Sequence, residues 1–281
     1  MKYSDVSRFS FAILMSLTIS KAAAFEIVGH RGASFDAPEN SLASMKLAWV
    51  QKADGIETDI SLSKDGKMVV MHDDNTKRTG GVDKKIADHT WDELKDIDIG
   101  KWKGPQFTGE KIPTLESFFA TIPDGKCIFT EIKLKDSVQG ADFEKAKAIL
   151  DELDKAMTAS GKKPNQLRII TFHYNMAKAA KERFPKHPVY WLAGYTKDKK
   201  TGKLPDIDEL IQKAKDAKVD GLDLNSGFPM NKAFVKKVHK AGLKLYTWTV
   251  DDPEVARAEK KAGVDGITTN RPEFLRAELK K

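Results

Sequence analysis

The sequence predicts an α/β fold, a TIM (β/α)8 barrel with a small inserted subdomain after the second barrel strand. Eight short apolar runs have the length and composition of buried β-strands, and helical patterns lie between most of them over about 250 residues. A doubly wound open sheet is the alternative, but that fold usually carries a Gly-rich phosphate-binding loop, which this sequence lacks. The closed barrel is therefore favoured.

The predicted strands are runs rich in Val, Ile, Leu, Phe and Thr. In chain order they cover residues 26–30, 55–63, 127–133, 168–172, 188–193, 221–225, 243–250 and 266–269. A further short strand is expected at 67–72. Side chains alternate between the two faces of a strand, so each run presents one face to the barrel interior and one to the helices.

Helices are predicted where apolar residues recur at helical spacing. One apolar stripe runs through 143–157 and another through 207–214. Asp252 followed by Pro253 is typical of an N-cap and a first-turn proline. Gly242 and Gly263 are each expected to end a helix.

The connection between the second and third barrel strands is too long for an ordinary loop. After the short strand at 67–72 it continues to residue 113 and contains Trp91, Trp102 and Phe107. We therefore expect an inserted subdomain over about 73–113, placed at the mouth of the barrel.

Residues 1–24 have the organisation of a signal peptide. Lys2 and Arg8 precede an apolar run at 9–19 that is too short to span a bilayer, and a small-residue cleavage site follows at 22–24. A short N-terminal core helix is the alternative. The signal peptide predicts an exported protein, periplasmic or secreted, with its folded domain over 25–281. No later segment is apolar enough to cross a membrane, so we expect no stable membrane insertion after cleavage.

The chain is mildly basic, with a formal net charge of +7. Its lysines are spread along the predicted helices, and no motif combines basic and aromatic residues, which argues against nucleic acid as a partner. The charge suits a small anionic substrate. Cys127 is the single cysteine, so an internal disulfide is excluded.

Carboxylates lie inside two of the predicted strands. Glu57 and Asp59 are two residues apart and share a face, and Glu131 shares a face with Lys133 in the next barrel strand. Like charges this close need a cation or a proton between them. Oxygen ligands without a Cys or His cluster predict one hard divalent cation, Ca²⁺ or Mg²⁺. Ion pairs of these carboxylates with Arg31 and Lys133, without a metal, are the alternative.

Functional residues of a TIM barrel lie at the carboxyl ends of its strands. His30 ends the first predicted strand and Lys133 ends the third. Phe172 and Trp248 lie at the ends of the fourth and seventh strands, where they would form either a wall for the substrate or part of the core.

These motifs make the chain similar to the glycerophosphodiester phosphodiesterase family. The matches follow the family's order from about residue 26 to the end: His30-Arg31-Gly32, Pro38-Glu39-Asn40-Ser41, Glu57-x-Asp59, Ser63-Lys64-Asp65-Gly66, His72-Asp73, Arg78-Thr79, Ile112-Pro113-Thr114-Leu115, Glu131-Ile132-Lys133, Trp248-Thr249-Val250 and Gly263-Val264-Asp265-Gly266-Ile267. One departure is Asn270, where the family more often has aspartate. The resemblance also implies an insertion like the one expected at 73–113.

The resemblance implies metal-dependent hydrolysis of glycerophosphodiesters to glycerol 3-phosphate and an alcohol, with His30 and His72 as the acid–base pair. We expect His72 to be the general acid for the leaving alcohol and His30 to be the base. Glu57, Asp59 and Glu131 are expected to bind the metal ion. Arg31 and Lys133 are expected to bind the phosphate.

Two other functions are alternatives. A phospholipase D-like enzyme acting on intact lipid, as sphingomyelinase D does, is disfavoured by the long insertion, which the related sphingomyelinase D enzymes largely lack. A non-catalytic phosphopolyol-binding protein would be expected to lack catalytic residues, and none of those that the family implies is missing here.

Overall fold

The computed structural model describes residues 24–135, 137–198 and 201–281. The predicted signal peptide, apart from Ala24, lies outside these residues. No helix in the described part of the chain is both long and apolar enough to cross a membrane.

Within the described ranges, eight parallel strands form a barrel that closes because β1 pairs with both β2 and β9. The barrel strands are β1 (Glu26–Gly29), β2 (Gly55–Leu62), β4 (Cys127–Ile132), β5 (Leu167–Thr171), β6 (Val189–Ala193), β7 (Gly221–Asn225), β8 (Lys244–Trp248) and β9 (Gly266–Thr269). The predicted TIM barrel is confirmed, and this closure rules out the open sheet.

The strand boundaries differ little from those expected. The runs at 221–225 and 266–269 coincide with β7 and β9. The predicted 243–250 strand shortens to β8, although Val250 beyond its end still donates its N–H to Thr268 O on β9. The short strand at 67–72 reduces to β3 (Met68–Val70), which pairs antiparallel with β2.

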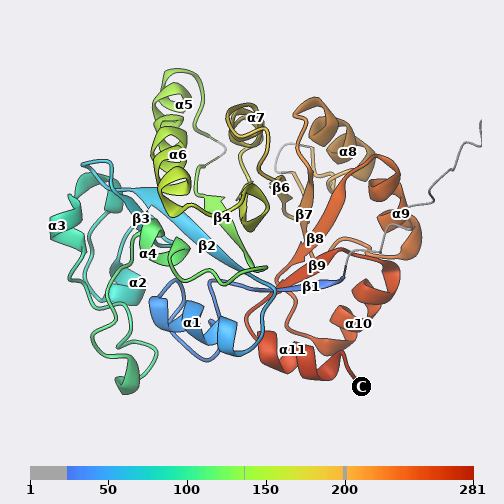
Figure 1. The fold of residues 1–281 in the computed structure, drawn as a ribbon. Helices are drawn as coiled ribbons and strands as arrows, with labels where there is room; N and C mark the ends of the chain where they lie inside the picture. Colours follow the sequence, from blue (N-terminus) through green and yellow to red (C-terminus); the bar gives the residue numbers. More distant parts are fainter. Residues whose placement is uncertain (1–23, 136, 199–200) are drawn as a thin grey trace, which may run out of the picture.

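Helices surround the barrel on the outside (Figure 1). The helices that follow the barrel strands are α1 (Leu42–Val50), α4 (Leu115–Phe119), α5 (Gly140–Ala146), α6 (Ala148–Ser160), α7 (Tyr174–Arg183), α8 (Ile207–Asp216), α9 (Lys232–Lys240), α10 (Pro253–Ala262) and α11 (Pro272–Glu278), with a 3-10 turn at Pro164–Gln166. The single stripe expected at 143–157 is divided between α5 and α6. Asp252 caps α10 as predicted, and Gly263 ends it with a φ of 98°.

The segment between β3 and α4 carries short elements of its own. These are α2 (Lys77–Gly80), α3 (Trp91–Leu94) and 3-10 turns at Ile86–Asp88 and Pro105–Phe107. In Figure 1, α2 and α3 lie together on the β3 side of the barrel. Their packing rests on a small apolar cluster that includes Val69, Met71, Ile86, Leu94 and Ile112.

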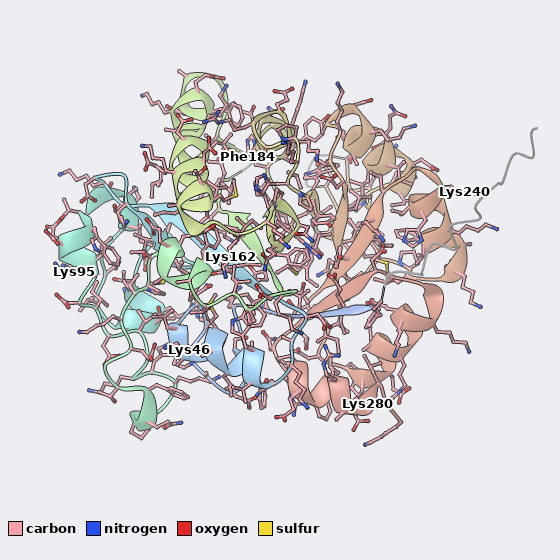
Figure 2. The ribbon with its side chains drawn as sticks, in the orientation of Figure 1. Lys46, Lys95, Lys162, Phe184, Lys240 and Lys280 are labelled. Carbon is pink, nitrogen blue, oxygen red and sulfur yellow. The ribbon has the colours of Figure 1, made fainter. Side chains whose placement is uncertain are left out.

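The apolar core has two main layers. A large cluster fills the space between the outer face of the sheet and the helices, and a smaller one fills the barrel interior with residues such as Val28, Phe129 and Tyr190. Many lysines lie outside both, and Figure 2 shows Lys95 and Lys240 at the periphery of the molecule. The interior cluster leaves room at the carboxyl ends of the strands, and this is where the polar residues gather.

Candidate active site

Three buried carboxylates meet inside the barrel on β2 and β4. Asp59 and Glu131 are paired in register between these strands, so both point inward, and Glu57 lies one inward position earlier. Each of Glu57, Asp59 and Glu131 offers an oxygen within 4.8 Å of the oxygens of the other two. Local strand periodicity and parallel pairing thus produce a concentrated negative charge.

Two basic residues partly balance this charge. Lys133 Nζ lies 2.8 Å from Glu131 Oε1 and 3.4 Å from Asp59 Oδ1. Arg31 donates its backbone N–H to Glu57 Oε2 at 2.9 Å, and its Nε lies 3.4 Å from Asp59 Oδ2. The backbone of Arg31 has a φ of 53°, in the left-handed region, which turns the chain back towards β2 directly after β1.

The carboxylates still carry more charge than these two partners neutralise. Burial, with the charges of Asp59 and Glu131, raises the pKa of Glu57 well above its ordinary value. Burial and the charge of Asp59 raise the pKa of Glu131 to about 7. Burial also opposes ionisation of Asp59, but Lys133 and Arg31 hold its pKa below the ordinary value.

These residues fit a divalent cation. Glu57 Oε1 is buried and accepts no hydrogen bond from any residue in the described ranges, and buried Asp59 Oδ1 has only the ion pair with Lys133 at 3.4 Å. Orphaned buried carboxylate oxygens are costly unless a cation occupies the space between them. The acidic triad could therefore hold one metal ion, as the sequence predicted, while the identity of the ion stays a prediction.

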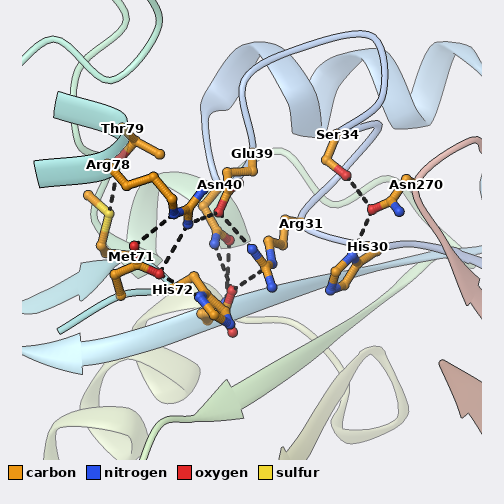
Figure 3. Close-up of polar contacts among 12 residues, drawn as sticks. His30, Arg31, Ser34, Glu39, Asn40, Met71, His72, Arg78, Thr79 and Asn270 are labelled. Atoms are coloured by element: carbon orange, nitrogen blue, oxygen red, sulfur yellow. Dashed lines mark hydrogen bonds and ion pairs between the residues drawn. The ribbon is translucent and has the colours of Figure 1, made fainter. Parts of the chain in front are cut away.

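His30 is held in one tautomer by residues far away in the chain. Its Nδ1 lies 2.7 Å from Asn270 Oδ1, which also accepts from Ser34 Oγ at 2.8 Å (Figure 3). Asn270 Nδ2 donates to Asp251 Oδ2. An amide oxygen only accepts, so His30 Nδ1 carries the proton. Burial and the charge of Arg31 lower the pKa of His30, which favours the neutral ring with a lone pair on Nε2.

His72 is held by an anionic partner. Its Nδ1 lies 2.7 Å from Asp73 Oδ1, and Asp73 also accepts from Arg78 Nε at 2.8 Å. The hydrogen bonds from Arg78 lower the pKa of Asp73 to about 2, so this residue is a carboxylate and His72 Nδ1 donates to it. The Nδ1 atoms of the two histidines therefore have different partners: an amide oxygen for His30 and a carboxylate for His72.

Glu39 joins the insertion to the first barrel loop. It accepts from Arg31 Nη1 at 2.7 Å and from Arg78 Nη1 and Nη2 at 2.7 and 2.8 Å, as Figure 3 shows. Arg78, on α2, thus links Glu39 with Asp73. Neighbouring Asn40 donates to Asp59 Oδ2 at 2.7 Å. This hydrogen-bond network connects the first barrel loop and the insertion to the buried carboxylates, and so holds these two segments in place beside the site.

A cavity of about 130 Å³ lies among these groups. Eight of the nine residues predicted for the site line it: His30, Arg31, Glu57, His72, Glu131, Lys133, Phe172 and Trp248. Asp59, the ninth, does not line the cavity and lies buried against Asn40, Arg31 and Lys133. Phe172 and Trp248 form part of an apolar wall, with their ring centroids 5.3 Å apart.

Asp223, which was not among the predicted site residues, also lines this cavity. It lies inside β7 between two leucines and is 2% exposed. A carboxylate within an apolar strand is the same signal that pointed to Glu57, and it was present in the run at 221–225.

A second, larger cavity of about 650 Å³ adjoins the first. The two share His72, Glu131, Lys133 and Phe172. Asp73, Asp74 and Lys135 are among the other residues that line the outer cavity. His72 therefore borders both a small inner space and a larger outer one.

Comparisons with known proteins agree with this geometry. The model of the glycerophosphoryl diester phosphodiesterase family matches residues 30–274. The chain is 31% identical over 253 residues to a glycerophosphodiester phosphodiesterase of Caldanaerobacter subterraneus subsp. tengcongensis, covering 89% of this chain and 95% of that protein. It is 30% identical over 258 residues to a glycerophosphodiester phosphodiesterase of Bacillus subtilis, covering 88% and 84%.

Among solved structures, an Oleispira antarctica phosphodiesterase in complex with the product sn-glycerol-3-phosphate superimposes with a TM-score of 0.78 at 25% identity, covering 91% of this chain and 97% of that one. The glycerophosphodiester phosphodiesterase of Agrobacterium tumefaciens has a TM-score of 0.73 at 22% identity, covering 90% and 100%, and supports the fold.

Proposed function

The chain belongs to the glycerophosphoryl diester phosphodiesterase family and is a phosphoric diester hydrolase, and we propose that it hydrolyses glycerophosphodiesters to glycerol 3-phosphate and an alcohol with the help of a divalent cation and two histidines. The observation that carries the proposal is the convergence of His30, His72 and the acidic triad on one cavity. The location of the protein outside the cytoplasm stays a prediction from residues 1–24.

Substrate binding would begin with the phosphate. Arg31 and Lys133 line the cavity and present positive charge to the non-bridging oxygens of a phosphodiester. Glu57, Asp59 and Glu131 would hold the cation, which when bound supplies Lewis-acid polarisation of a phosphate oxygen. The anionic substrate thereby enters a site that would otherwise repel it.

Two proton transfers would follow. His30 Nε2 takes a proton from the attacking water as the new O–P bond forms, because Nδ1 is already occupied as a donor to Asn270. His72, held through Nδ1 by Asp73, gives its Nε2 proton to the alcohol oxygen as the old P–O bond breaks. The Nδ1 contacts with Asn270 and Asp73 therefore support His30 as the base and His72 as the acid.

The two cavities suggest where the ends of the substrate lie. The inner cavity of about 130 Å³ suits the compact glycerol end, and the outer one of about 650 Å³ has room for head groups of different size. His72 borders both, which is the position required of a group that protonates the leaving alcohol. This arrangement favours a broad choice of head group.

The test is release of glycerol 3-phosphate from glycerophosphocholine and glycerophosphoethanolamine, with and without EDTA. We expect release that EDTA abolishes and that added Ca²⁺ or Mg²⁺ restores. Release that is insensitive to EDTA would overturn the metal requirement. Phosphocholine and glycerol as products would mean that the other P–O bond breaks, and no release from either substrate would contradict the proposed reaction.

A further inference from the structure

Asp223 is a buried carboxyl group that the proposed mechanism does not use. It lies on the inner face of β7 and lines the inner cavity. Among the described residues, no hydrogen bond or ion pair reaches its side chain, and its Oδ1 is fully enclosed without a partner. Buried polar groups are nearly always paired, so an unpaired one facing a substrate cavity indicates a ligand.

The nearby basic residues are already engaged elsewhere. Arg31 contacts Glu39 and Asp59, and Lys133 contacts Asp59 and Glu131. Burial, with the charge of Glu131 as the smaller cause, raises the pKa of Asp223 to about 8. A neutral carboxyl group both donates and accepts hydrogen bonds, which matches a hydroxyl group and does not repel a phosphate.

Asp223 lies on the floor of the cavity. In the sheet it pairs in register with Leu192 on β6 and Tyr246 on β8. Trp248 pairs with Asn225, two residues further along β7, and so lies closer to the carboxyl ends of the strands. Trp248 Nε1 donates to the Asp223 carbonyl oxygen at 3.1 Å, which fixes the indole above this layer. The floor thus offers one carboxyl group beside apolar surface from Ile170 and Leu192.

This combination fits the far end of a glycerol unit. Its carbon atoms would contact the apolar wall, while the phosphate lies near Arg31 and Lys133. The terminal hydroxyl, which is the polar group most distant from the phosphate, then needs a partner on the floor, and a hydroxyl buried there without one would be costly.

Building on the proposed function, we propose that Asp223 is a specificity-determining residue that hydrogen-bonds the terminal hydroxyl of the glycerol unit. The glycerol end of the substrate then occupies the inner cavity, and the head group lies outside it. The enzyme then discriminates between substrates by their polyol end and not by their head group.

The experiment compares glycerophosphocholine with the analogue in which the terminal hydroxyl is replaced by hydrogen, which retains the hydroxyl next to the phosphate-bearing carbon. The wild-type enzyme should prefer glycerophosphocholine in kcat/KM by about tenfold or more, because the analogue leaves the buried carboxyl unpaired. Asp223→Leu should reduce this preference to within about twofold, and Asp223→Asn should keep most of it, since the amide also donates and accepts.

The matched control is Glu259→Gln. Glu259 is another buried carboxyl group with a pKa raised by burial to about 7, but it accepts from Thr247 Oγ1 and does not line the cavity. Its variant should keep the wild-type preference. Equal rates of the wild-type enzyme on both substrates would overturn the inference even if Asp223→Leu fails to fold. An unchanged preference in folded Asp223→Leu would also overturn it. Failure of the wild-type enzyme to release glycerol 3-phosphate would instead overturn the proposed function, and this inference with it.

Discussion

Cation binding to the acidic triad should release protons in a pH-dependent manner. Glu131 has a pKa raised to about 7, and that of Glu57 is raised well above its ordinary value. A carboxyl group must lose its proton before it coordinates a cation. Below about pH 7 the bound proton therefore competes with the metal, and above it the competition fades. Metal affinity should accordingly rise with pH and then level off.

The size of the effect follows from the pKa of Glu131. A group with a pKa of about 7 is about 90% protonated at pH 6 and about 10% protonated at pH 8. The Kd for Ca²⁺ or Mg²⁺ should thus be about tenfold weaker at pH 6 than at pH 8, or about 1.4 kcal/mol, and about a hundredfold weaker at pH 5. Proton release from Glu57 would steepen this dependence further.

Isothermal titration calorimetry in two buffers of different ionisation enthalpy measures both the Kd of the cation and the number of protons released on binding. About one proton or more should be released per cation at pH 6, and far fewer at pH 8. Glu259→Gln removes a buried acid outside the site and should leave the proton count unchanged, whereas Glu131→Gln should reduce it. A Kd that is constant from pH 5 to pH 8, with no protons released, would refute the reasoning.

Three further outcomes are expected. His30→Ala and His72→Ala should keep the wild-type melting temperature but lose about 10²–10⁴-fold in kcat, and unfolding of either would show a structural role instead. Glu57→Gln should weaken metal binding by more than about tenfold in calorimetry, and unchanged affinity would remove Glu57 from the ligand set. Arg168→Met removes two of the hydrogen bonds that Glu26 accepts at the other end of the barrel, of 2.6 and 2.9 Å, and leaves the one from Tyr246. Urea unfolding should show a loss of about 3 kcal/mol, while kcat stays within about twofold; a large loss of kcat in folded protein would contradict a purely structural role.

Local sequence patterns were enough to predict most of the fold and the buried carboxylates of the site. The strand at 55–63 could be predicted because apolar residues alternate with Glu57 and Asp59 along it, and strand geometry alone puts both carboxylates on one face. Parallel pairing with β4 then brought Glu131 level with Asp59, as the barrel prediction required.

Other parts of the site depend on partners that no local pattern selects. Asn270 Oδ1 accepts from His30, 240 residues away in the sequence, and Arg78 reaches Glu39 across 39 residues. Each residue type is common at strand ends or helix starts for reasons unrelated to a site. Their pairing became visible only when closure of the barrel placed β9 beside β1 and the insertion beside the first loop.

The sequence by itself determined the barrel, the inward faces of β2 and β4 and the acidic triad, because strand periodicity and apolar runs are properties of neighbouring residues. The tertiary structure decided the tautomer of His30, the anionic support of His72 and the unpaired state of Asp223. Hydrogen bonding and desolvation depend on which groups the closed barrel brings together and which it leaves alone, and that is a property of the whole fold.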